Sequence, residues 1–190
     1  MIKTMREATK KFFLPLFLMM FAACASAEET SGTGTGWQEA YATFRTAVLS
    51  GNDAHAAELG DGFIDAAAAD LNYHNPEFGR IALEVGTAHQ RAGNLTRAAD
   101  LIGQAHAAFV FSQGYVDREA FDALALLAEV HLDADKPDDA LRLYHECIAV
   151  SVIGGYQADQ PGLLVGLADT YETLDPRIAS AIRQSPIFPK

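Results

Sequence analysis

The stretch GNLTRAADL at residues 93–101 decides the fold, because its pattern occurs three times in the chain. It aligns without gaps with GNDAHAAEL at residues 51–59 and with DKPDDALRL at residues 135–143. The alanines that align are Ala56, Ala98 and Ala140, so the spacing is 42 residues in both steps. A fixed period of this length indicates repeated supersecondary units that stack on one another. We therefore expect a stack of at least three similar units.

The residues around these stretches have the spacing of amphipathic helices. Apolar side chains recur every four residues at Ala40, Phe44 and Val48, and again at Ile81 and Val85. This period places them on one face of a helix, whereas a strand would alternate apolar and polar residues. The pattern favours an all-α fold with helices on both sides of each turn.

Four prolines mark positions where helices are expected to begin. Proline is favoured at the first helical position, where its missing N–H group has no helical partner and its fixed φ suits the helix. A polar residue precedes each proline, as in Asn75-Pro76, Lys136-Pro137, Gln160-Pro161 and Asp175-Pro176. These four dipeptides predict four helix starts.

Small and apolar residues occupy matching places in two of the units. The second unit has Gly86, Ala88, Gly93, Ala98, Ile102 and Ala105, and the third has Leu127, Ala128, Asp135, Ala140, Tyr144 and Cys147. Small residues are needed where two helices cross closely. On these residues the chain resembles the tetratricopeptide repeat (TPR) family, in the longer variety seen in kinesin light chains. The resemblance implies antiparallel helix pairs stacked in a right-handed solenoid.

The resemblance covers residues 37–184 and weakens towards both ends. In the first unit Thr43, Phe44 and Ala47 stand where the family has a large, a small and an aromatic residue. A degenerate fourth unit begins near Leu163, and its short second helix over residues 176–184 would cap the stack. Residues 185–190 are expected to form a tail.

The N-terminal segment has the order of an export signal. Four basic residues, Lys3, Arg6, Lys10 and Lys11, precede an apolar run over residues 12–23. A membrane span needs about 20 apolar residues, so this run is too short to be a permanent one. A basic head followed by a short apolar run is typical of a signal peptide of an exported bacterial protein, here residues 1–27. The polar run EETSGTGTG at residues 28–36 is expected to act as a flexible linker.

Two processing sites compete at the end of this signal. Ala25-Ser26-Ala27 has small residues at the positions that a general signal peptidase reads, and cleavage there would leave a free periplasmic protein that starts at Glu28. Phe21-Ala22-Ala23-Cys24 resembles a bacterial lipobox, and cleavage there would leave Cys24 lipidated as the first residue. Phe21 departs from the leucine usual in that motif, so both outcomes remain open: periplasmic, or anchored by lipid in the bacterial envelope.

The charge of the chain restricts its partners. The formal net charge is -11, and removal of residues 1–27 takes away four basic residues and Glu7, which gives -14. A strongly acidic surface is repelled by the phosphates of nucleic acids and by anionic lipid headgroups. We therefore expect a protein or peptide partner, with basic segments favoured, and contact with a membrane only through a lipid anchor at Cys24.

No pattern in the sequence indicates catalysis. Only Cys24 and Cys147 are present, and Cys147 lies in an apolar helical pattern typical of a buried small residue. His89 and His131 are 42 residues apart, but no carboxylate or cysteine recurs with them at the spacing of metal ligands. The chain also lacks a nucleophile elbow, a phosphate-binding loop and an HExxH motif. We predict neither a catalytic residue nor a metal or cofactor.

The resemblance also implies a place for the partner. In the TPR family the first helix of each pair lines a groove that holds a peptide or a partner helix, and we name its counterpart here the first-helix face. Matching the repeats places Tyr41, Arg45, Arg80, Thr87, Gln90 and Arg91 in the early half of this face, and Asp122, Glu129, Asp133, Asp169 and Glu172 in the late half. The early half is basic to neutral and the late half is acidic. We expect an interaction scaffold or adaptor, with a small-ligand-binding or enzyme accessory domain as the alternative.

Overall fold

The computed structural model of the chain describes residues 36–186 and 188, and the described part is built from helices. The α-helices are α2 (Gly36–Leu49), α3 (Asp53–Leu71), α4 (Pro76–Arg91), α5 (Leu95–Gln113), α6 (Arg118–Asp133), α7 (Pro137–Gly154), α8 (Gln160–Leu174) and α9 (Pro176–Arg183). A short 3-10 helix, η2 (Gln157–Asp159), precedes α8. Strands are absent from these described residues, so the predicted all-α class is confirmed.

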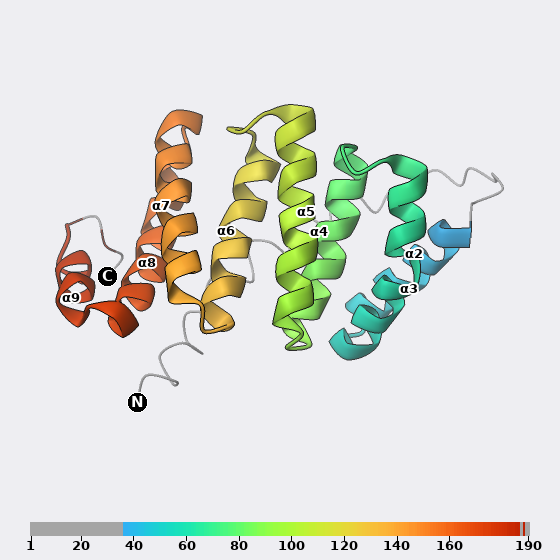
Figure 1. The fold of residues 1–190 in the computed structure, drawn as a ribbon, viewed down its shortest axis with the longest axis horizontal. Helices are drawn as coiled ribbons and strands as arrows, with labels where there is room; N and C mark the ends of the chain where they lie inside the picture. The colour runs from blue at the N-terminus through green and yellow to red at the C-terminus, as the bar shows by residue number, and fades with distance from the viewer. Residues whose placement is uncertain (1–35, 187, 189–190) are drawn as a thin grey trace. The chain divides into compact units, whose positions relative to one another are not determined.

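The helices follow one another in chain order as four pairs, from α2 and α3 at one end to α8 and α9 at the other (Figure 1). Each helix packs chiefly against the helix before it and the helix after it. Such nearest-neighbour packing is characteristic of a solenoid, in which each unit completes the core of the next. Across the described ranges, no helix is long and apolar enough to cross a membrane.

The helix starts follow the proline signals. Pro76, Pro137, Pro161 and Pro176 each occupy one of the first two positions of a helix, as predicted. Asn75 caps α4, since its side-chain oxygen accepts a hydrogen bond from the backbone N–H of Glu77 at 2.8 Å. Asp117, 42 residues later, caps α6 by accepting from the backbone N–H of Glu119 at 2.8 Å. Side-chain caps of this kind satisfy N–H groups that have no partner within the helix.

The turns inside the pairs share one backbone conformation at the 42-residue step. Gly51, Gly93 and Asp135 have φ values of 73°, 84° and 58°, all in the left-handed region. Glycine adopts this region without a steric penalty, and aspartate tolerates it better than most residues. The repeated sequence stretches therefore encode a repeated turn as well as repeated helices.

The aligned alanines lie at the close crossings between helices. Ala56, Ala98 and Ala140 are each 0% exposed, which confirms the packing predicted from their spacing. Gly86 shows why the partner position must also be small, because a Cβ added there would lie 2.7 Å from Cγ1 of Ile102. Helices α4 and α5 therefore approach too closely for a side chain at that point.

The first pair solves the same packing problem with the sizes reversed. Phe44 occupies the place of Gly86 and Ala128, and it is fully buried. Gly60 in α3 occupies the place that Ile102 takes in the second pair, so a large residue on the first helix is matched by the absence of a side chain on the second. Phe44 also packs edge-on against Phe63, with ring centroids 5.7 Å apart. This exchange explains why the first unit departs from the family pattern.

The buried residues form two hydrophobic clusters that meet at α6. The first cluster extends from Trp37 in α2 to Val130 in α6, and the second extends from Phe121 in α6 to Leu167 in α8. Helix α6 contributes Ala123 and Val130 to one cluster and Phe121 to the other, from different sides of the helix. It therefore acts as the wall shared by both halves of the stack.

Candidate partner-binding surface

The predicted residues of the first-helix face lie on the first helices of the four pairs, as the repeat alignment required. Their placement is Tyr41 and Arg45 on α2; Arg80, Thr87, Gln90 and Arg91 on α4; Asp122, Glu129 and Asp133 on α6; and Asp169 and Glu172 on α8. Neighbouring first helices join this face through polar contacts. The Tyr41 hydroxyl donates to Oε2 of Glu84 at 3.0 Å, and Nε2 of Gln90 donates to Oδ2 of Asp133 at 3.4 Å.

These two contacts have the same geometry in the repeat. Each joins a residue to one that is 43 positions later, which lies one repeat and one residue further along the chain. Burial raises the pKa of the Tyr41 hydroxyl, and the nearby Glu84 carboxylate raises it further. Burial also raises the pKa of Glu84. The early half of the face is thus a partly buried polar seam between α2 and α4.

The early arginines have partners within the chain. Nε and Nη2 of Arg80 donate to the two carboxylate oxygens of Glu119 at 2.7 and 3.0 Å. Burial by itself raises the pKa of Glu119, but hydrogen bonds from Arg80 and Gln113 lower it on balance. Arg80 therefore links α4 to α6 through a two-pronged ion pair, a geometry that guanidinium groups favour.

The other residues of the early half are tied locally. Nη1 of Arg91 lies 3.9 Å from Oδ1 of Asp53, and the guanidinium of Arg45 lies 6.0 Å from the centre of the Tyr41 ring. The Thr87 hydroxyl donates to the carbonyl of Leu83 in its own helix at 2.7 Å. The structure thus spreads the early basic residues over separate local contacts.

One predicted acid of the late half is engaged by an arginine that the sequence reading omitted. Nε of Arg118 lies 2.9 Å from Oδ1 of Asp122, and Nη1 of Arg118 lies 2.8 Å from Oδ2 of Asp159. The Arg118 guanidinium also lies between the rings of Phe121 and Tyr156, at 5.5 and 5.2 Å from their centres. Burial raises the pKa of Asp122 despite the charge of Arg118. Asp122 therefore belongs to a structural clamp between α6 and the start of α8.

A second arginine does the same at the end of the stack. Arg183 on α9 lies 3.1 Å from Oδ1 of Asp169 through Nη2, and its Nη1 pairs with Glu172. Both acids belong to α8, so this cluster fastens the terminal helix to the pair that it caps. The sequence predicted the two acids as part of an acidic half but not the arginine that partly balances them.

Three predicted acids converge on one buried tyrosine. The carboxylates of Glu129, Asp133 and Asp169 all lie close enough to the Tyr144 hydroxyl to raise its pKa, in addition to the larger effect of burial. Tyr144 reaches this position because its ring packs directly against α8 at Gly166, where a Cβ would overlap the ring. Carboxylates from α6 and α8 are thereby gathered around one point at the junction of α6, α7 and α8.

Sequence reasoning missed Arg118, Arg183, Glu84 and Glu119, but some signals were present. Arg118 and Asp122 are four residues apart on one helix, a spacing at which opposite charges pair. Glu84 could have been found by searching for polar residues about one repeat from Tyr41. No comparable signal pointed to Arg183, because its place depends on how the terminal helix folds back.

The two histidines each face a carboxylate on a different helix. His89 is 2% exposed, and its Nε2 lies 3.3 Å from Oδ1 of Asp61 on α3. Nδ1 of His131 lies 3.7 Å from Oδ2 of Asp139 on α7. Burial lowers the pKa of both imidazoles. Among the residues that the structure describes, no group of three or more His, Cys, Asp or Glu side chains is placed to hold a metal ion.

The two cysteine positions differ in what the structure describes. Cys147 is fully buried in α7, and burial raises the pKa of its thiol to about 12. A thiol of this kind is almost entirely protonated at neutral pH and is a poor nucleophile. Cys24, like the whole predicted signal and its processing sites, lies outside the described residues.

Comparison with solved structures identifies the arrangement of the helices. A crystal structure of kinesin-light-chain-type, nearly identical TPR-like repeats from Podosopora anserina superimposes with a TM-score of 0.68, covering 93% of this chain and 82% of that one. The chain has a TPR-like repeat fold. A point variant of the same TPR-like repeats matches with a TM-score of 0.63, covering 94% of this chain and 86% of that one.

The TPR-like likeness is one of structure, with sequence identities of 17% and 18% to these two proteins. No family model matches the sequence, and no curated protein matches it either. The family resemblance read from the 42-residue period is therefore supported at the level of the fold.

Proposed function

We propose that this protein is a non-catalytic scaffold of the bacterial cell envelope that binds a basic segment of a partner protein on its first-helix face. The convergence of Glu129, Asp133 and Asp169 at the Tyr144 hydroxyl carries the proposal. Carboxylates gathered at one place reinforce each other's field, so they orient a cationic group more strongly than scattered surface acids do. A lysine or arginine side chain of the partner has the matching charge.

The paired arginines limit the acidic region to this junction. Arg118 offsets the charge of Asp122, and Arg183 offsets Asp169 and Glu172 in part. Glu129 and Asp133 on α6 therefore form the centre of the proposed site, with Asp169 completing it from α8. The site is narrower than the acidic half expected from the repeat alignment.

A charge reversal tests the proposal. The Glu129→Lys/Asp133→Lys variant should lose capture of the partner that the wild type retains from an envelope extract, and wild-type capture should weaken as salt rises, because salt screens exposed charges over about 8 Å. The matched control is Asp100→Lys/Asp138→Lys, which makes the same charge change at exposed positions of α5 and α7. Equal capture by both variants at both salt concentrations would place recognition elsewhere.

We also propose that the protein is exported, because the basic head at residues 3–11 and the apolar run at residues 12–23 have the order of a signal. The intact mass of the protein isolated from its native cells tests this. A chain that starts at Glu28 would indicate a free periplasmic protein, and acyl chains on Cys24 would indicate a lipoprotein. A mass that includes residues 1–23 would overturn the export proposal.

A further inference from the structure

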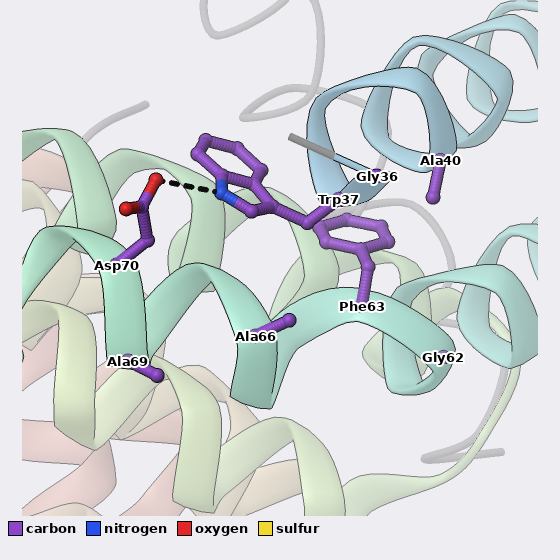
Figure 2. A pocket seen from close by; sticks show the side chains of 8 residues that line it. All are labelled: Gly36, Trp37, Ala40, Gly62, Phe63, Ala66, Ala69 and Asp70. Atoms are coloured by element: carbon purple, nitrogen blue, oxygen red, sulfur yellow. Dashed lines mark hydrogen bonds between the residues drawn. The ribbon is translucent and has the colours of Figure 1, made fainter. Parts of the chain in front are cut away.

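An open hollow of about 640 Å³ lies in the first helix pair, away from the first-helix residues discussed above. We name it the Trp37 hollow, and its lining consists of Gly36, Trp37, Ala40, Gly62, Phe63, Ala66, Ala69 and Asp70. Figure 2 shows the Trp37 indole from α2 beside the Phe63 ring and the small side chains of α3. None of the predicted groove residues lines it.

The repeat itself shows that this surface is one that another element can cover. Gly36 and Ala66 are exposed and Ala40 is partly buried, whereas their counterparts 42 residues later are all 0% exposed. Those counterparts are Phe78, Ala82 and Ala108. The difference between the two pairs is that the second has α3 packed against α4, and the first has no described helix before it.

The second pair also shows what kind of side chain provides this cover. Tyr73, in the turn that follows α3, packs edge-on against Phe78, with ring centroids 5.2 Å apart. Phe78 occupies the position that Gly36 has in the first pair. The first pair therefore lacks both the ring at that position and the aromatic residue of a preceding turn.

The linker of the chain itself offers no suitable group. Residues 28–35 read EETSGTGT and contain neither an aromatic nor a large aliphatic side chain. A group that fills the Trp37 hollow of the processed protein must therefore come from another molecule. This distinguishes the hollow from an end surface that the adjoining part of the chain could cover.

The charge at the rim restricts that group further. Asp70 is the only ionisable side chain among the described residues that line the hollow. Its Oδ2 accepts a hydrogen bond of 2.9 Å from Nε1 of Trp37, which fixes the indole beside the opening (Figure 2). An aromatic ring can pack against Trp37 and Phe63, and a cation next to that ring can approach the Asp70 carboxylate.

From these observations we propose that the Trp37 hollow is a second docking site, which takes an aromatic side chain of a partner protein flanked by a basic group. The partner's aromatic residue takes the role that Tyr73 has one repeat later, at the open end of the stack. The site is independent of Glu129, Asp133 and Asp169, so its existence does not rest on the function proposed above.

Tyramine is a minimal probe for this site, because it joins a phenol ring to an ammonium group. The chain has a single tryptophan, so the one indole N–H signal in an NMR spectrum reports on the hollow. In a chain that starts at Glu28, which contains the compact unit Gly34–Lys190, tyramine should shift this signal in a saturable manner. Butylamine, which lacks the ring, should not, and 3-(4-hydroxyphenyl)propanoate, which reverses the charge, should bind several-fold more weakly.

Two variants separate the hollow from nonspecific binding. Ala66→Leu places a side chain in the opening and should abolish the response, whereas Ala54→Leu, at an exposed position of α3 outside the lining, should preserve it. Asp70→Asn keeps an acceptor for the indole and should remove the preference for the amine over the carboxylate. A response to tyramine that survives Ala66→Leu, or no response in the unmodified chain, would overturn the proposal. Glu129→Lys/Asp133→Lys should bind tyramine as the unmodified chain does, so the two proposals can fail separately.

Discussion

The ring of Tyr144 in α7 lies directly against Gly166 in α8, with no space for a Cβ between them. Tyr144 is almost completely buried, so its ring cannot easily move aside. The glycine therefore allows the last two pairs to approach and holds the tyrosine hydroxyl beside the three acids.

This relationship predicts opposite signs for two glycine-to-alanine substitutions. Gly166→Ala should lower the melting temperature, because overpacking costs about 1–3 kcal/mol and exceeds the gain in helix propensity. Gly62→Ala, at an exposed helical glycine with nothing within 4 Å of the added Cβ, should be stabilising by about 0.5–1 kcal/mol. Thermal unfolding measures both. If Tyr144→Leu fails to rescue Gly166→Ala, the ring is not the cause of the effect.

The alanines at the helix crossings give a second contrast. Ala98→Leu and Ala140→Leu should each cost about 1–3 kcal/mol, because both side chains are fully buried at close approaches. Ala107→Leu and Ala149→Leu alter less buried positions of the same two helices and should change stability by about 0.5 kcal/mol or less. Denaturant unfolding of the four variants checks this. Equal effects at the two kinds of position would contradict the packing register.

The left-handed turn predicts a purely conformational effect. Gly93 has φ of 84° and open space around the missing Cβ, so Gly93→Ala should cost about 1–2 kcal/mol without any clash. Gly93→Asp should cost less, since Asp135 already adopts this conformation in the next repeat. Gly103→Ala, in the middle of α5 and also in open space, should instead be stabilising. Thermal unfolding should therefore rank Gly103→Ala above Gly93→Asp and Gly93→Ala last.

The buried His89 predicts a loss of stability in mild acid. Burial lowers its pKa in the folded protein, with Asp61 opposing and Arg97 adding to the shift. The fold thus favours the neutral imidazole, and this contribution is lost as the pH falls below the unfolded value of about 6.5. The melting temperature should drop between about pH 7.5 and 5.5, and less so in His89→Gln.

Other groups titrate in the same range, so the His89 test uses a difference between variants. The pKa values of Glu84 and Asp122 are raised by burial, and these acids contribute a dependence of opposite sign. His55→Gln, at an exposed position of α3, should retain the full pH dependence of the wild type. An identical dependence in His89→Gln and the wild type would show that protonation of His89 does not affect folding.

The fold was predictable because its determinants are local or periodic. The prolines begin helices by a mechanism that acts within one turn, and Ala56, Ala98 and Ala140 report the repeat through their equal spacing. The exchange of sizes between Phe44 and Gly60 was not predictable, because it preserves the packing while breaking the pattern at both positions. A sequence motif cannot register a compensation between two helices.

The candidate surface was predictable in its location but only partly in its charge. The repeat alignment placed the residues on the first helices, where the structure has them. The balance of charge depends on Arg118 and Arg183, whose partners include Asp159 and Asp169, distant in the sequence. The Trp37 hollow was missed because small residues such as Ala66 and Ala69 give no signal of what is absent beside them.

The shared wall formed by α6 has a kinetic consequence for the two halves of the stack. Cys147 lies within the second cluster only, and its buried, protonated thiol can react with a labelling reagent only after that half opens. The labelling rate of this one atom is therefore a clock for local opening of α6–α9, whereas the Trp37 indole lies in the first cluster and reports on the other half. A single chain thus carries one spectroscopic and one chemical reporter, and comparing them reveals whether the solenoid opens from one end or as a whole.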